Sequence, residues 1–251
     1  RSTPRSSSAA SDVYKRQYWK DGKFTSFGEA MTMLEEKGVS VNIASFLGAA
    51  TTRILEVGYK NRQATPSEME RMRGHVENSM KEGAMGIGSS LIYAPGDYAS
   101  TEELTELSKV ASEYGGMYIS HLRSEGTNLL EALEELISIS RNANIPAEVY
   151  HLKASREPNW SKLDDVIKRI EEVRKEGLKI TADIYTYNAS STGLTGVIPT
   201  WVQDGGHRAW INRMKDPEVR PRLLADIREQ LDEQPPEGIL LVGFKTSKMS
   251  R

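Results

Sequence analysis

The sequence predicts a parallel α/β fold, a partial (β/α)8 barrel of the TIM type with about six βα units present. Strand-like segments alternate with helical patterns, which is typical of βαβ units in a parallel sheet. The strands begin near positions 41, 84, 117, 147, 179 and 239. Much of this spacing is close to about thirty residues, the size of one such unit. An open dinucleotide-binding sheet fits less well, because the glycines that would have to follow a strand instead precede or interrupt one, at positions 83, 86 and 88.

The first half of the chain carries two amphipathic helices and two strands. Apolar residues in 26–37 recur at helical spacing, and a glycine ends that pattern. The segment 41–48, VNIASFLG, is a short apolar strand. A threonine cap followed by proline opens a helix over 65–81. The segment 84–93 is a strand that leads into the turn-rich loop APGD.

The second half continues this alternation and carries two strands that each end near a histidine. A serine or threonine with a following glutamate caps its first helix. The expected elements, in order, are a helix over 100–114, a strand from 117, a helix over 127–143, a strand from 147, a helix over 161–176, a strand from 179 with a polar tail, a mostly helical stretch over 207–232 and a last strand over 239–244.

Residues 1–17, RSTPRSSSAASDVYKRQ, differ in composition from the rest of the chain. They are rich in serine and arginine, lack apolar periodicity and have no hydrophobic region of the kind that a signal peptide needs. We expect a non-native or disordered tail, similar to the translated adapter sequence found at the ends of metagenomic gene fragments. Residues 18–251 are then expected to form an incomplete barrel domain, an internal piece of a longer protein.

The composition excludes several classes of function. The formal net charge is −2 and 27% of residues are charged, so we expect no electrostatic attraction to nucleic acid or to an anionic membrane. The sequence contains no run of about eighteen apolar residues, the length that crosses a bilayer. Cysteine is absent, which rules out disulfides, thiolate metal ligands and a cysteine nucleophile in these 251 residues.

Two histidines stand where strand signals stop and polar residues begin. His121 follows MYIS, and His151 follows EVY about one βα unit later. The carboxyl ends of barrel strands carry the active site, and neutral imidazole is a preferred zinc ligand. We therefore expect His121 and His151 to bind one metal ion, with a hydrogen-bonded structural role as the alternative for each. His75 and His207 are expected to be solvated or to cap helices.

Other polar residues follow the same strands. Lys153 shares the strand face of His151 and could bind a substrate carboxylate or lie along the surface. Arg123, spaced likewise after His121, could hold a substrate carboxylate or a structural acid such as Glu125.

The strand from 179 ends in an aspartate and a tail rich in hydroxyl groups. Asp183 could be a further metal ligand or could hold a neighbouring loop by hydrogen bonds. The tail 185–193, YTYNASSTG, could orient an anionic substrate with neutral donors, or could form a turn that satisfies its own polar groups.

Four motifs occur in order along the chain: GAMGIGSSLIYAPGDYASTEEL, GGMYISHLRSEG, the His-x-Lys of YHLKAS, and ADIYTYNASSTGLT. Together they resemble the N-acyl-D-amino-acid deacylases, or D-aminoacylases, of the amidohydrolase superfamily. The resemblance covers roughly residues 40–225.

This resemblance implies a barrel flanked by a small β-sandwich, with one or two zinc ions. It implies hydrolysis of the amide bond of a small N-acyl-D-amino acid to a carboxylate and a free D-amino acid. His121 and His151 match the two histidine ligands of the tightly bound zinc. Lys153, Tyr185 and Ser191 match residues that hold the substrate carboxylate.

The chain also departs from the family pattern. The HxH metal motif and a further cysteine or glutamate ligand are expected before residue 18. The aspartate that acts as general acid and base is expected beyond Arg251. Where many relatives have GHGT or GHST, this chain has GAAT at 48–51. We therefore expect the parent protein to be the deacylase and this piece alone to be inactive.

Three alternatives remain open from the sequence. The first is another amidohydrolase reaction, such as hydrolysis of a cyclic amide or imide or of a dipeptide. The second is a non-catalytic barrel in which the histidines are structural and the loops bind a ligand. The third is a Schiff-base lyase that uses Lys153.

Overall fold

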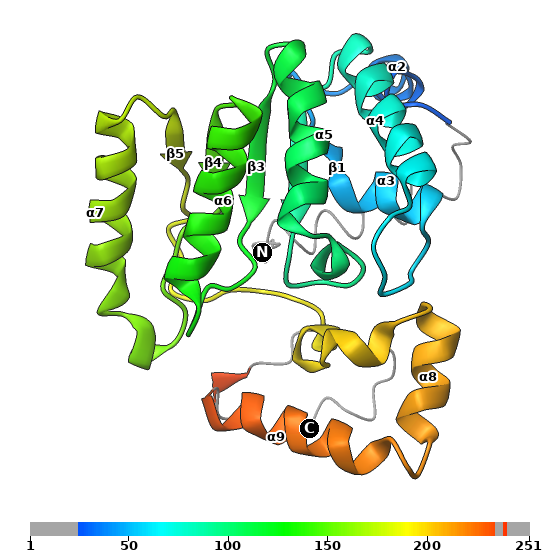
Figure 1. The fold of residues 1–251 in the computed structure, drawn as a ribbon, viewed down its shortest axis with the longest axis vertical. Helices are drawn as coiled ribbons and strands as arrows, with labels where there is room; N and C mark the ends of the chain where they lie inside the picture. The colour runs from blue at the N-terminus through cyan, green and yellow to red at the C-terminus, as the bar shows by residue number, and fades with distance from the viewer. Residues whose placement is uncertain (1–24, 234–237, 240–251) are drawn as a thin grey trace.

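The protein, represented by a computed structural model, is described over residues 25–233 and 238–239. The expected tail 1–17 lies outside the described residues, as does nearly all of the expected strand 239–244. The described part contains a parallel sheet whose strands are paired in chain order, as the barrel prediction requires (Figure 1). These strands are β1 (Leu47–Gly48), β2 (Gly86–Ser90), β3 (Met117–His121), β4 (Ala147–Val149) and β5 (Ile180–Ala182).

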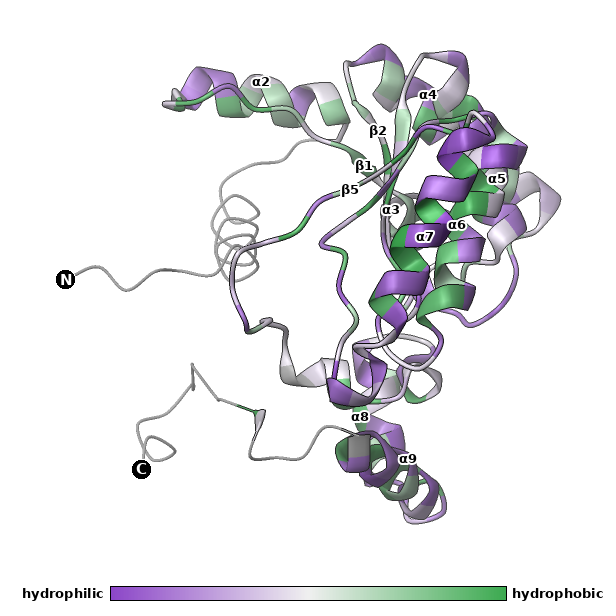
Figure 2. Cartoon of the chain, turned by 90° about the vertical axis from the view of Figure 1, so that its left-hand side faces the viewer, coloured by the Kyte–Doolittle hydropathy of each residue, from purple (hydrophilic) through white to green (hydrophobic). Residues whose placement is uncertain are grey.

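Helices connect the strands and gather on one face of the sheet. Figure 2 shows α4 to α7 on the same side, with the other side of the sheet turned away from them. The helices that follow the strands are α3 (Ala49–Glu56), α4 (Pro66–Lys81), α5 (Thr101–Glu113), α6 (Leu129–Ala143) and α7 (Lys162–Lys175), and α2 (Phe27–Lys37) precedes β1. No helix in the described ranges is both long enough and apolar enough to cross a membrane.

The chain after β5 lies beyond the carboxyl ends of the strands, at the bottom of Figure 1. It forms α8 (His207–Lys215) and α9 (Arg220–Glu233), which correspond to the helical stretch expected over 207–232. Pro217 separates the two helices, because proline disfavours helical backbone in the residue before it. Short 3-10 turns also occur in the loops: η1 (Gly96–Tyr98), η2 (Glu157–Asn159), η3 (Leu194–Val197) and η4 (Thr200–Gln203).

The helix starts confirm the capping signals. Thr65 and Glu68 form a reciprocal capping box at the start of α4, with Pro66 in the first turn. Ser100 accepts a hydrogen bond from the backbone N–H of Glu103 at the start of α5. Each such cap satisfies backbone donors that the first helical turn leaves unpaired, and is worth about 1 kcal/mol.

The core lies between the sheet and the helices. One row of residues crosses four strands in register, Ile87 beside Tyr118, then Ala147, then Ile180, and each is almost fully buried. The helices cover this row with apolar side chains at helical spacing, among them Leu104, Leu107, Leu133, Leu136, Ile137, Val166 and Val173. Neighbouring positions along a strand point to the opposite face, so His121 projects to the side away from the helices.

Two elements differ from the sequence prediction. The strand expected over 41–48 is reduced to two residues at the edge of the described sheet, where it pairs with β2. The sequence did not predict α3, because its β-branched residues have low helix propensity. Tertiary contacts stabilise it: the fully buried Arg53 donates to Glu103 on α5 at 2.6 Å.

Gly86 is required where β2 meets β3. Its φ is +149°, and a Cβ atom built there would lie 1.9 Å from the carbonyl oxygen of Met117, its partner in register. Gly74 on α4 offers a contrast, since a Cβ atom there would have no neighbour within 4 Å.

We expect Gly86→Ala to lower the free energy of unfolding by about 1–3 kcal/mol or more, because β2 and β3 must move apart to accommodate the added methyl group. Gly74→Ala should instead stabilise it by about 0.5–1 kcal/mol, since alanine is the better helix former. Urea unfolding of the two variants measures both changes. A Gly86→Ala protein as stable as the parent would contradict the close β2–β3 contact as the reason for glycine at this position.

Candidate metal-binding site

The two candidate metal ligands are placed by neighbouring strand ends. His121 is the last residue of β3 and lies in register with Ser90 of β2. His151 follows β4 by two residues, in a turn with φ of 45°, a conformation that few residues other than glycine adopt. The Asp183 side chain accepts a hydrogen bond from the backbone N–H of His151. Of the two roles considered for Asp183, the hydrogen bond that holds a loop is the one that the structure shows.

Glu125 joins the two histidines. One ligand atom from each of His121, Glu125 and His151 can be chosen so that all lie within 4.8 Å of one another. The Glu125 Oε1 atom is 3.0 Å from His151 Nδ1 and 3.8 Å from His121 Nε2. The imidazole rings are perpendicular, with centroids 4.5 Å apart. Two imidazoles and a carboxylate are a ligand set suited to zinc.

Hydrogen bonding and burial set the charge states of this cluster. His121 Nδ1 lies 3.0 Å from the carbonyl oxygen of Leu122, which favours a proton on Nδ1 and leaves the Nε2 lone pair for a ligand. Burial lowers the pKa of His121, against the attraction of Glu125. Burial by itself raises the pKa of Glu125, but its contacts with His151, His121 and Lys153 outweigh burial and leave that pKa below its usual value. A neutral imidazole and an ionised carboxylate are the forms that bind metal.

Lys153 brings its ammonium group into the same cluster. Its Nζ atom is 2.5 Å from Glu125 Oε1 and 2.8 Å from both Nδ1 and the carbonyl oxygen of His151. Lys153 Nζ also lies 5.4 Å from the ring centroid of Tyr185, which is 6.2 Å from the His151 ring. The structure therefore brings four predicted site residues together, and adds Glu125.

Ser191 and Arg123 take different positions. Ser191 lies on the exposed loop after β5, next to Thr192, whose hydroxyl bonds to the Tyr93 hydroxyl at 2.8 Å. Arg123 donates from Nε and Nη2 to the two carboxylate oxygens of Glu135, at 2.8 Å each, and from Nη1 and Nη2 to the carbonyl oxygens of Asp97 and Ala99. Its acidic partners are thus Glu135 and, at 3.6 Å, Asp97, and not Glu125. These contacts favour a structural role over the predicted contact with substrate.

Sequence reasoning missed Glu125 as a possible metal ligand. Glu125 follows His121 by four residues. Because it lies in a loop, no regular periodicity predicts where its side chain points. The two remaining histidines fit the expected minor roles. His75 Nε2 pairs with Glu56 at 2.7 Å on the surface, and His207 begins α8 with its ring against Trp210.

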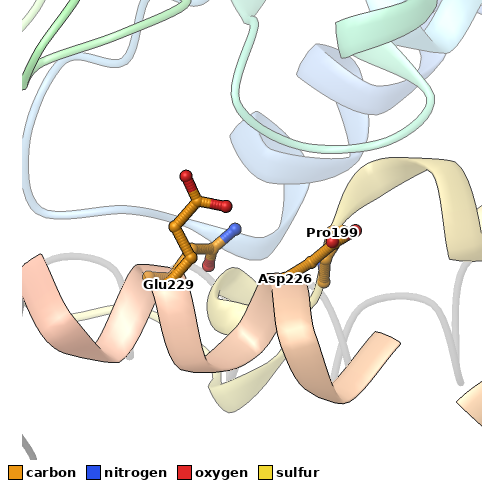
Figure 3. Close-up of a pocket in the computed structure, with 4 residues that line it drawn as sticks. Pro199, Asp226 and Glu229 are labelled. Carbon is orange, nitrogen blue, oxygen red and sulfur yellow. The ribbon is translucent and has the colours of Figure 1, made fainter. Parts of the chain in front are cut away.

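A surface hollow of about 320 Å³ lies elsewhere, between α9 and the loop before η4 (Figure 3). Pro199, Asp226, Glu229 and Gln230 line it, and none of them is a predicted site residue. Its lining contains two carboxylates and no histidine, and it shares no residue with the His121, Glu125 and His151 cluster.

The sequence is similar to known deacylases over part of their length. It is 33% identical over 172 residues to a D-aminoacylase of Alcaligenes xylosoxydans xylosoxydans, a match that covers 68% of this chain and 35% of that protein. It is 30% identical over 159 residues to an N-acyl-D-glutamate deacylase of the same organism, covering 63% and 33%. The chain thus spans about a third of the length of these relatives. No family model matches it.

Solved structures show the same similarity. The N-acyl-D-glutamate deacylase of Bordetella bronchiseptica, in complex with zinc and a phosphonate mimic of the tetrahedral intermediate, matches with a TM-score of 0.64 at 27% identity, over 65% of this chain and 35% of that one. A D-aminoacylase crystal structure matches with a TM-score of 0.63 at 29% identity, over 66% and 35%. Both support the barrel assignment.

We expect Arg123→Ala to lower the free energy of unfolding by about 1.5–3 kcal/mol, because it removes charge-assisted hydrogen bonds and leaves Glu135 half-paired. Arg174→Ala, which breaks only a surface pair with Glu171, should cost less than about 1 kcal/mol. Thermal unfolding of both variants measures the difference. If both variants lost the same small amount of stability, Arg123 would have no structural role, and its predicted contact with substrate would be favoured instead.

Proposed function

Because the matched part of this chain belongs to the D-aminoacylase family of amidohydrolases, we propose that the complete gene product is a zinc-dependent hydrolase of N-acyl-D-amino acids. The reaction cleaves the amide bond and yields a carboxylate and a free D-amino acid. The observation that carries the proposal is the His121, Glu125 and His151 cluster at adjacent strand ends. This donor set at the carboxyl ends of the strands favours a metal-dependent reaction over a barrel that only binds a ligand.

The residues present fit a bound cation. The ammonium group of Lys153 already occupies a position within 2.8 Å of both a Glu125 oxygen and a His151 nitrogen. A positive charge is therefore stable there, surrounded by donors of electron pairs. We assign zinc to His121 and His151, with Glu125 as a third ligand from this chain. Bound zinc supplies a Lewis acid for the amide carbonyl and lowers the pKa of water from 15.7 to about 7.

Lys153 has a second role in the proposed reaction. A metal ion bound to Glu125 and His151 would repel an ammonium group held by the same two residues. The ammonium group of Lys153 would then leave Glu125 and pair with the α-carboxylate of the substrate. Tyr185, whose ring lies beside Lys153, and Ser191 on the same loop supply neutral donors to that carboxylate.

Holding the carboxylate at one fixed place relative to the metal explains a preference for one enantiomer. Three points of attachment, at the carboxylate, the amide and the side chain, are met together by one hand of the substrate. The resemblance gives the proton transfer to an aspartate, and that step is assigned to none of the residues above.

The direct test is an assay of the complete gene product with N-acetyl-D-amino acids, their L enantiomers, a cyclic imide and a dipeptide. We expect release of free D-amino acid that a chelator abolishes and added zinc restores. Hydrolysis of only the imide or the dipeptide by the zinc-loaded protein would move the assignment to that amidohydrolase reaction. No hydrolysis of any of them would overturn the proposal.

The zinc ligands are tested on the same protein. His121→Ala should weaken zinc affinity by more than about 100-fold, the upper range for removing a residue that only supports a ligand. His75→Ala, a change of the same side chain on the surface of α4, should leave the zinc content unchanged. The zinc content per chain of both variants is measured by mass spectrometry after dialysis. An unchanged zinc content in His121→Ala would remove His121 from the ligand set.

Lys153→Ala should raise KM for N-acyl-D-amino acids by about 10- to 100-fold, since a charge-assisted hydrogen bond is lost. An N-acyl amine that lacks the carboxylate should show the same KM with both proteins. Lys175→Ala, an exposed lysine at the end of α7, is the control. Equal effects on the two substrates would show that Lys153 does not bind the carboxylate.

A further inference from the structure

Tyr93 lies between the metal-binding cluster and the loop after β5. Its ring meets the ring of His121 edge to face, with centroids 5.7 Å apart. Its hydroxyl is 2.8 Å from the hydroxyl of Thr192, 99 residues along the chain. The residue next to Thr192 is Ser191, one of the predicted carboxylate-binding residues. One side chain therefore touches a candidate ligand and the loop that carries the candidate substrate donors.

The backbone around Tyr93 is closely constrained. The N–H of Leu91 donates to the carbonyl oxygen of His121 at 3.1 Å, which extends the β2–β3 pairing past the end of β2. The N–H of Asp97 then donates to the carbonyl oxygen of Tyr93, which closes a turn. A Cβ atom on Gly96 would lie 2.7 Å from the carbonyl oxygen of Ser90, so this turn folds closely onto the strand end. Tyr93 is a fixed point rather than a free loop residue.

The far end of the loop is also attached to this turn. Thr200 donates from its hydroxyl to Asp97, and Tyr98 donates from its hydroxyl to the carbonyl oxygen of Thr200 at 2.6 Å. Arg123 in turn donates to the carbonyl oxygen of Asp97 at 2.8 Å. In Figure 1 the yellow segment runs from the lower end of β5 to the helices beneath the sheet. The segment 183–200 is thus attached at Asp183, at Thr192 and at Thr200.

We propose that Tyr93 is a positioning residue that holds the loop 185–199 in the place where Tyr185 and Ser191 meet the substrate carboxylate. This role rests on the proposed function. Tyr93 does not need to touch the substrate. Its ring is placed against His121 and its hydroxyl holds Thr192, so it sets the distance between the metal site and the carboxylate site. Of the three attachments, the one to Tyr93 is next to a proposed substrate contact.

The hydroxyl can be removed without the ring. Tyr93→Phe keeps the aromatic contact with His121 and deletes the bond to Thr192, and Thr192→Val deletes the same bond from the other side. Thr192→Ser keeps it. Tyr114→Phe is a matched control, because it also removes a tyrosine hydroxyl that donates to a partner, Glu77, but at the other end of the strands.

Two measurements on the complete, zinc-loaded gene product test this role. The first is amide hydrogen exchange of the peptide that spans 185–199, which needs no activity. We expect exchange to quicken by about two- to tenfold in Tyr93→Phe and in Thr192→Val, and no further in the double variant, because all three lack the same bond. Thr192→Ser and Tyr114→Phe should exchange like the parent. Unchanged exchange in Tyr93→Phe would overturn the inference.

The second measurement is steady-state kinetics. KM for N-acyl-D-amino acids should rise by about two- to tenfold in Tyr93→Phe, with kcat and zinc content nearly unchanged, and Thr192→Ser should behave like the parent. An N-acyl amine without a carboxylate should show no change. A fall in kcat with KM constant, or an equal effect on both substrates, would count against positioning of the carboxylate loop. If the parent hydrolyses no substrate, the proposed function fails, while the exchange result still decides whether Tyr93 holds the loop.

Discussion

The pairing of β3 with its two neighbours is the interaction on which the candidate site depends. Its helix-facing side buries Tyr118 in the row shared with Ile87 and Ala147, and the helices fix that row by covering it. A slip of one residue would turn Tyr118 out of the core and send His121 toward the helices. The register that fills the core therefore also aims His121 at the opposite face, where the site forms.

The pairing does not stop where the strands end. Backbone hydrogen bonds continue from Leu91 to His121, from Tyr150 to Ser120 and from Leu152 to Asp183. Since these bonds lie in the loops, they hold the side chains at the strand ends in fixed positions instead of leaving them mobile. This explains how a turn with positive φ at His151 is maintained, at a cost that such backbone conformations carry, of about 1–3 kcal/mol.

Charge balance completes the site. The Glu125 carboxylate is mostly buried and lies within hydrogen-bonding distance of Lys153 and His151. An unpaired carboxylate in this place would be costly, so the cluster needs a cation, either an ammonium group or a metal ion. In the proposed function, zinc would meet the same requirement for a cation, and Lys153 would be released when the metal binds. Fold stability and proposed function use the same groups.

The parallel α/β architecture, most helix boundaries and the strand-end positions of His121, His151 and Lys153 could be predicted from the amino-acid sequence. Periodicity, capping residues and strand-end position are local signals, and they predict the structure correctly where tertiary packing favours the same conformation. The sequence did not predict that Glu125 joins the histidines, that Arg123 pairs with Glu135 or that Tyr93 bonds to Thr192. These choices depend on how turns direct side chains and on contacts between distant segments, and a local pattern encodes neither. The short helix α3 was missed for the same reason, since the partner that stabilises it, Glu103, lies 50 residues from Arg53.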